Sequence, residues 1–143
     1  MSRARFLLFL SVFALACAGS FAAGRASAGL HEPGELGVAR IWHGRVPTAK
    51  AGEYARYLYD AGITHMRARP SNLGIQVLRR TMGDVTDFTV ISYWPSHESI
   101  AEWADKSDVT KARYLDRDKE YLLELEPNVA HYDVVVSEGR FTR

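Results

Sequence analysis

Hydrophobic and polar residues follow two different periods between residues 38 and 136. Runs of β-branched and aromatic residues predict four strands, at 38–43, 73–81, 86–94 and 130–136, with a turn at 82–84. Between the first two strands, apolar residues recur at the spacing of one helical face: Ala51, Tyr54, Ala55 and Leu58. The chain therefore begins its folded part with a strand, a helix and a second strand.

Capping residues predict where the helices begin and end. Thr48 is the best N-cap for the first helix, and Gly62 suits its end. Ser96 is the predicted N-cap of a second helix, whose apolar face is Ile100, Trp103 and Ala104. The charged stretch 114–121 is predicted to lie at the surface.

The order strand–helix–strand–strand–helix–strand predicts an α+β fold. It is typical of a ferredoxin-like βαββαβ domain, with a four-stranded antiparallel sheet and both helices on one face. We assign 37–137 to this domain, 29–36 to a linker and 138–143 to a C-terminal tail.

The third predicted strand is apolar on both of its faces. Phe88, Val90 and Trp94 lie on one face, and Ile91 and Tyr93 lie on the other. Helices cover one face of such a sheet, so the other face also needs a cover. We expect a second protomer to supply it, which predicts a homodimer with the architecture of a dimeric α/β barrel.

The N-terminus has the pattern of a bacterial export signal. Residues 1–28 contain no Asp or Glu. Arg3 and Arg5 near the start are followed by 14 apolar or small residues and by a cleavage site of small residues that ends at Ala28. The sequence thus predicts a signal peptide at 1–28 and an exported protein, periplasmic or secreted. Alternatively, Ala14 to Cys17 resembles a lipobox, and Cys17 would then carry a lipid that anchors the protein to the membrane.

Composition excludes several classes of function. The 143 residues carry 18 basic and 17 acidic side chains, and three of the basic ones lie in residues 1–28. Such a balance does not favour nucleic-acid binding. One cysteine allows no disulfide within the chain, and no histidine pair has metal-ligand spacing, so we expect no metal site.

Candidate site residues are aromatic or basic. His43 would lie at the rim of a pocket if its side of the first strand, shared with Ala39 and Ile41, faces the helices. The other candidates for ligand contacts are Trp94, Trp103, Arg113, Tyr114 and His131. Arg113 has possible partners in Asp108, in Asp116 or in a ligand carboxylate.

Several segments together resemble the antibiotic biosynthesis monooxygenase family. They are Ile91-Ser92-Tyr93-Trp94-Pro95-Ser96, Ala101-Glu102-Trp103, Lys106-Ser107-Asp108-Val109 and Lys111-Ala112-Arg113-Tyr114. The resemblance covers residues 36–137 and implies a dimeric α/β barrel with ferredoxin-like protomers. It also implies an oxidoreductase acting on a small molecule, but it does not specify one reaction.

Some members of that family oxidise polycyclic phenols with O₂ and no cofactor. In such a mechanism the pocket favours the phenol anion, and the anion reduces O₂ directly. The resemblance then suggests that His43 accepts the proton and that Trp94 and Trp103 form the cavity wall.

Other members degrade haem, using an Asn, a Trp and a His iron ligand. The Trp corresponds to Trp103, the Asn falls at or near His43, and the His falls on Tyr114. Haem is therefore the less favoured expectation. A third hypothesis is a non-catalytic protein of the same fold that binds a small aromatic or apolar ligand and needs no proton acceptor.

Overall fold

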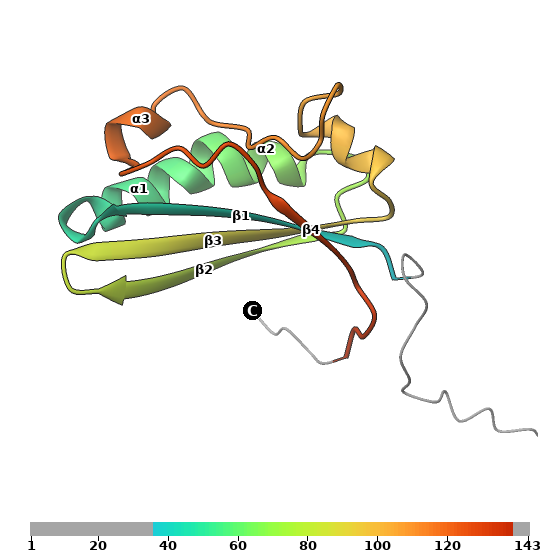
Figure 1. Ribbon diagram of the computed structural model, residues 1–143, viewed down its shortest axis with the longest axis horizontal. Helices are drawn as coiled ribbons and strands as arrows, with labels where there is room; N and C mark the ends of the chain where they lie inside the picture. The colour runs from blue at the N-terminus through green and yellow to red at the C-terminus, as the bar shows by residue number, and fades with distance from the viewer. Residues whose placement is uncertain (1–35, 139–143) are drawn as a thin grey trace, which may run out of the picture.

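The computed structural model describes residues 36–138 (Figure 1). The predicted signal peptide 1–28 with Cys17 lies outside the described residues. So does nearly all of the predicted linker 29–36 and of the predicted tail 138–143.

Four strands form one antiparallel sheet. They are β1 (Val38–Pro47), β2 (Gly74–Met82), β3 (Val85–Trp94) and β4 (Ala130–Asp133). Their order is β2-β3-β1-β4, so β1 and β3 form the centre. This is the predicted ferredoxin-like arrangement, and the α+β fold class is confirmed. The last strand is shorter than the predicted 130–136.

The turn between β2 and β3 agrees with the prediction. Met82 pairs with Val85, which leaves a two-residue connection. Gly83 has a φ of 59°, a left-handed conformation that glycine adopts without steric cost. This turn joins β2 and β3 into a long hairpin, which fixes the register of these two strands.

One continuous helical segment packs on the sheet. It runs through a 3₁₀ turn η1 (Thr48–Lys50), α1 (Ala51–Tyr57), a π-helical turn η2 (Leu58–Ile63) and α2 (Thr64–Arg67). The predicted end at Gly62 is wrong. The π turn inserts an extra residue and returns Ile63 and Met66 to the buried face, so continuing the helix buries more apolar surface.

Neither predicted N-cap residue is the N-cap in the structure. Thr48 does not cap the helix, because its hydroxyl donates to the carbonyl of Gly83 instead, at 2.9 Å. The N-cap of the second helical element is His97 and not the predicted Ser96, although the Ser96 hydroxyl accepts a hydrogen bond from the Ser99 N–H at 3.4 Å. The second helix is a short 3₁₀ element, η3 (Glu98–Glu102), and its predicted apolar residues Ile100, Trp103 and Ala104 are all buried.

Residues 111–129, which we call the strap, cross back over the molecule before β4. The strap contains one short helix, α3 (Asp118–Tyr121), and lies over the helical layer in Figure 1. The prediction that 114–121 lies at the surface is wrong for Asp118 and Tyr121, which are buried. The Leu123 N–H donates to the carbonyl of Arg45, so the end of the strap also follows the edge of β1.

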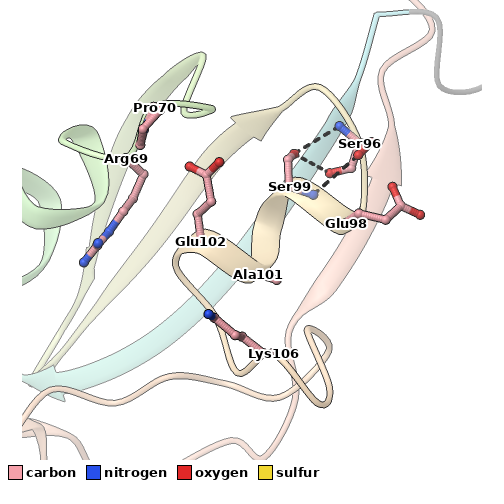
Figure 2. Close-up of a pocket in the computed structure, with 8 residues that line it drawn as sticks. All are labelled: Arg69, Pro70, Ser96, Glu98, Ser99, Ala101, Glu102 and Lys106. Atoms are coloured by element: carbon pink, nitrogen blue, oxygen red, sulfur yellow. Dashed lines mark hydrogen bonds between the residues drawn. The ribbon is translucent and has the colours of Figure 1, made fainter.

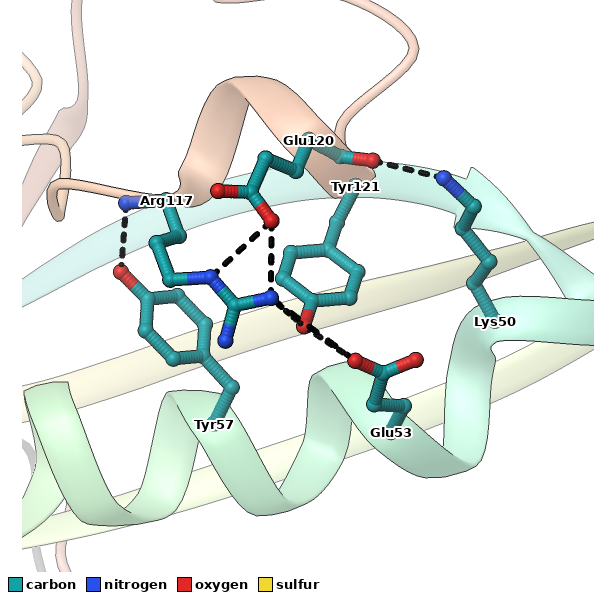
Figure 3. Close-up of polar contacts among 6 residues, drawn as sticks. All are labelled: Lys50, Glu53, Tyr57, Arg117, Glu120 and Tyr121. Atoms are coloured by element: carbon teal, nitrogen blue, oxygen red, sulfur yellow. Dashed lines mark hydrogen bonds and ion pairs between the residues drawn. The ribbon is translucent and has the colours of Figure 1, made fainter.

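An aromatic and charged cluster fastens α3 to α1 (Figure 3). The Tyr57 and Tyr121 rings stack at 5.5 Å, and the Arg117 guanidinium lies over both rings. Arg117 also pairs with Glu120, and the Tyr121 hydroxyl donates to Glu53 at 2.6 Å. These side-chain contacts therefore hold α3 of the strap against α1.

The face of β1 that meets the helices is the one that carries Trp42. Val38, Trp42 and Val46 are buried in the core beneath the helices. Ile41 and His43 lie on the opposite face, so the condition under which His43 would lie at the rim of a pocket beneath the helices is not met. No element between residues 36 and 138 covers that opposite face (Figure 1).

Candidate functional site

A small cavity lies between the sheet, the helical segment and the strap. Its volume is about 30 Å³, enough for roughly one water molecule. Its wall combines aromatic rings with two charged side chains. Among the lining residues are Trp42, Tyr54, Trp103, Arg113 and Asp118. Four different segments meet here, which makes this cavity the candidate site.

Asp118 is the acid of this cavity. Its side chain is 2% exposed and accepts hydrogen bonds from the Leu115 N–H at 2.7 Å and the Tyr54 hydroxyl at 3.3 Å. Burial raises the pKa of Asp118 above its ordinary value, although both hydrogen bonds oppose the rise. A carboxylate with a raised pKa is a better proton acceptor than a solvated one.

Arg113 and Trp103 form the basic side of the cavity. The guanidinium lies 4.4 Å from the centre of the Trp103 ring and donates to the Trp103 carbonyl. This stacking fixes the planar cation against the indole. In the part of the chain that the structure describes, neither of the predicted acidic partners, Asp108 or Asp116, forms an ion pair with Arg113. Its charge therefore remains available to a ligand.

Trp42 completes the aromatic wall and depends on Gly44. A Cβ atom on Gly44 would lie 2.3 Å from the Trp42 ring, which is far inside van der Waals contact. The indole thus lies flat over the bare backbone two residues further along β1. The Tyr114 ring meets Trp42 edge-on, with the ring centres 6.4 Å apart.

Two predicted site residues lie away from the cavity. His43 is on the open face of the sheet, where its Nδ1 lies 2.9 Å from Glu126 Oε1. Trp94 is fully buried, and its indole N–H donates to the Ser92 hydroxyl at 2.9 Å. Trp94 therefore supports the core beside the cavity rather than lining it.

The other two, Tyr114 and His131, do not line the cavity either. The Tyr114 hydroxyl donates to the carbonyl of Glu126 at 2.6 Å. His131 lies on β4 opposite Arg40, and its ring meets His97 edge-on. Of the six residues predicted from sequence, Trp103 and Arg113 are the two that the structure brings together at the cavity.

Comparison with solved structures places this arrangement among known folds. The chain is similar to a "Putative Antibiotic Biosynthesis Monooxygenase" from Bacillus cereus, with a TM-score of 0.52 and 14% identity over 75% of this chain and 99% of that one. This chain has the antibiotic biosynthesis monooxygenase fold. The comparison also finds MhuD, a haem-degrading protein of Mycobacterium tuberculosis solved with two haems in its active site. There the TM-score is 0.46, with 20% identity over 71% of this chain and 99% of that one. No family model and no curated protein matches the sequence.

Within this antibiotic biosynthesis monooxygenase fold, the donors around the cavity do not fit haem. An iron ligand at Tyr114 would be a phenolate, but burial, and then the neighbouring Glu126 charge, raise the pKa of Tyr114. Its hydroxyl is also already bonded to a backbone carbonyl. No histidine between residues 36 and 138 lines the cavity.

A second hollow, on the surface, has a different character (Figure 2). It is an open depression of about 770 Å³ between the end of the helical segment and η3. Charged and small side chains line it, and the Glu102 carboxylate there accepts from the Ser71 N–H and hydroxyl. Without an aromatic wall, this depression is the weaker candidate for a flat apolar ligand.

The part of the chain that the structure describes contains neither of two other kinds of site. No group of three or more His, Cys, Asp or Glu side chains could hold a metal ion there. No helix in that part is both long and apolar enough to cross a membrane.

Sequence analysis missed three residues that shape the cavity: Trp42, Tyr54 and Asp118. The sequence left open which face of the first strand carries the pocket, so Trp42 was not among the candidates, and Tyr54 was recognised as a core residue without a polar role. Asp118 lay in a stretch predicted to be exposed because most of its neighbours are charged. The pairing of Asp118 with Tyr121 on one turn of helix was the available signal for a buried side.

Proposed function

We propose that this protein binds a small planar aromatic molecule in the cavity and oxidises it with O₂, without flavin or metal. The observation that carries the proposal is the convergence of two indoles, a buried carboxylate and a stacked guanidinium on one cavity. Indoles suit a flat apolar ring, and the two charged groups suit a reaction that develops a phenolate.

Entry of such a ligand requires the strap to move. The cavity holds about one water molecule, whereas small-molecule sites occupy roughly 300–1,000 Å³. Arg113, Leu115 and Asp118 all line the cavity from the strap. The strap has little regular structure, and such segments open at lower free energy than a sheet core. Its displacement would enlarge the cavity without breaking β1 or β3.

The proposed chemistry uses Asp118 as the proton acceptor. Asp118 takes the acidic proton of the phenol, and Arg113 stabilises the anion that remains. The anion gives one electron to O₂, and the two radicals join to form a carbon–oxygen bond. For an anthrone-type substrate, loss of water from the resulting peroxide leaves a quinone. One oxygen atom then ends in the product and one in water, so no external reductant is needed.

Oxygen uptake with an anthrone-type phenol tests this assignment. We expect Asp118→Asn to lower turnover by about 100-fold, because a positioned base contributes roughly 10²–10⁴-fold. Ligand affinity, followed by quenching of tryptophan fluorescence, should change less than turnover. Asp116→Asn removes an exposed acid two residues away and is the matched control, with turnover unchanged.

His43→Ala compares the base suggested by the sequence with the base suggested by the structure. Because His43 lies on the open face beside Glu126, we expect full turnover in this variant. If His43→Ala stops oxygen uptake and Asp118→Asn does not, the assignment of Asp118 is wrong. If no planar phenol binds, the proposed function itself is wrong.

A second candidate function is non-catalytic binding of the same class of ligand. The position of the histidines favours it, because neither His43 nor His131 lines the cavity. Quenching of tryptophan fluorescence without any oxygen uptake would identify the protein as a binding protein.

We also propose that the protein acts as an exported homodimer. The open face of the sheet carries Ile41, Ile91 and Tyr93 at its centre, with Leu78 and Tyr132 more exposed at its sides. A second copy packed on this face would bury these side chains. Export would follow from residues 1–28, with release as a soluble protein or anchoring through a lipid on Cys17.

A further inference from the structure

Arg40 is a buried cation without an acidic partner. It lies on the helix-facing side of β1 and is 2% exposed. Its Nη2 donates to the carbonyl of Lys111 at 3.1 Å, but its Nε has no hydrogen-bond partner. Among residues 36–138, no carboxylate lies within ion-pair distance of it. Burial, and then the nearby charge of Arg113, lower the pKa of Arg40 to about 10.

A second buried nitrogen without a partner lies beside it. Arg40 and His131 are directly paired across β1 and β4, so their side chains project from the same face of the sheet. His131 Nε2 is buried and has no hydrogen-bond partner. The ring of His97 lies against His131, with the ring centres 5.3 Å apart.

The groups around these two nitrogens are basic. The charge of Arg113 acts on Arg40, and burial, followed by the neighbouring Arg40 and His97, lowers the pKa of His131. Glu98, next to His97, and Asp133, two residues after His131, form no ion pair with Arg40. A buried charge costs several kcal/mol when it is left unpaired, so folded proteins pair such groups.

We propose that Arg40 and His131 form a binding site for a small oxyanion, a carboxylate or a phosphate group. An oxyanion would accept a hydrogen bond from Arg40 Nε and another from His131 Nε2, and it would neutralise the guanidinium. This site is independent of the proposed oxygenase function, because Arg40 and His131 do not line the aromatic cavity.

Titration of the full chain with two anions tests the proposal. We would measure affinity by calorimetry and Tm by thermal denaturation in Tris chloride, adding sodium acetate or inorganic phosphate at constant ionic strength. We expect a saturable rise in Tm of roughly 5 °C at tenfold excess over Kd. A response to acetate alone identifies a carboxylate as the ligand group, and a response to phosphate identifies a phosphate group.

Three variants locate the site. Arg40→Met should weaken anion binding at least tenfold while leaving Tm without anion equal to or above that of the wild type, because an unpaired buried charge is gone. His131→Phe should also weaken binding at least tenfold, and it decides the question if Arg40→Met does not fold. Arg79→Met removes an exposed arginine of β2 on the other face of the sheet from the proposed dimer contact, and it should change neither anion binding nor Tm.

Three results would overturn the proposal. The first is the absence of a saturable Tm rise with both anions. The second is a rise that persists unchanged in Arg40→Met and His131→Phe, which would mean an adventitious ion only. A large fall in Tm of Arg40→Met without anion would instead assign Arg40 a purely structural role, provided that His131→Phe still binds both anions normally.

Discussion

Strand β3 presents two different faces to its surroundings. On the helix side, Phe88, Val90 and Trp94 are buried, and the polar Thr86 and Ser92 on the same side are buried too. On the other side, the residues of the same strand are half-buried throughout. The two faces have similar apolar side chains at the centre of the strand, so composition does not explain the difference.

The difference lies in what covers each face. Helices and the strap complete the first face within the chain, and the candidate cavity is formed there. The second face has no cover within residues 36–138 (Figure 1), although Ile91 and Tyr93 are as apolar as a covered face requires. A covered face provides stability and a binding site, while an open apolar face provides a surface for assembly.

The largest expected effect is on the covered face. Phe88→Ala should cost about 3–5 kcal/mol of unfolding free energy, because Phe88 is fully buried and meets the Tyr54 ring edge-on. Denaturation by urea measures the loss. Thr89→Ala, one residue along on the open face, is the control and should cost less than about 1 kcal/mol. Equal losses of unfolding free energy in the two variants would show that the two faces of β3 contribute equally to stability.

The next effect concerns assembly. Ile91→Arg places a charge in the middle of the open face, and we expect the dimer Kd to rise at least 100-fold because the charge would be buried at the interface. Light scattering at micromolar concentration should then give the monomer mass, against a dimer for the wild type. Val77→Arg, an exposed position of β2 on the other side of the sheet, should leave the dimer intact. A wild-type monomer would contradict the homodimer.

The smallest effect tests the polar contact beneath the strap. Tyr54→Phe removes a hydroxyl that donates to Asp118, and it should cost about 1–2 kcal/mol at pH 8. That hydrogen bond lowers the pKa of Asp118, so its loss raises the pKa further.

The pH dependence of this variant has a definite sign. A carboxyl whose pKa is raised in the folded protein favours folding at low pH, and this contribution is lost as the pH rises through the folded-state pKa. The cost of Tyr54→Phe should therefore be larger at pH 8 than at pH 4, as measured by Tm. If the cost of Tyr54→Phe is the same at both pH values, the Tyr54 hydroxyl does not influence the pKa of Asp118.

The fold was predictable from sequence because period and turn chemistry agree locally. The hairpin at Gly83 and the buried set of Ile100, Trp103 and Ala104 follow from neighbouring residues. The strand order follows instead from the βαββαβ succession of elements, which is typical of a ferredoxin-like sheet. The length of the helical segment did not follow, because the helix continues past Gly62 through the burial of Ile63 and Met66 against the sheet, which is a tertiary contact.

The site was predictable only in part, because strand period alone does not say which face is inward. In β1, Ile41 and Trp42 are both large and apolar, so the sequence offers two readings of the strand. The contact of Asp118 with Tyr54 joins residues 64 positions apart and depends on the path of the strap. Trp103 was a candidate because it lies on the apolar face of the second predicted helix, and Arg113 because a ligand carboxylate was one of its possible partners.

The close approach of Trp42 to Gly44 has a consequence for how this sequence can vary. Any side chain at position 44 would occupy the space of the indole, so a larger residue there requires a smaller or reoriented residue at position 42. The two positions should therefore change together in related proteins. Each such paired change would also alter the volume of the cavity, because Trp42 is part of its wall. The residues found at positions 42 and 44 in related proteins should therefore vary with the size of the ligand.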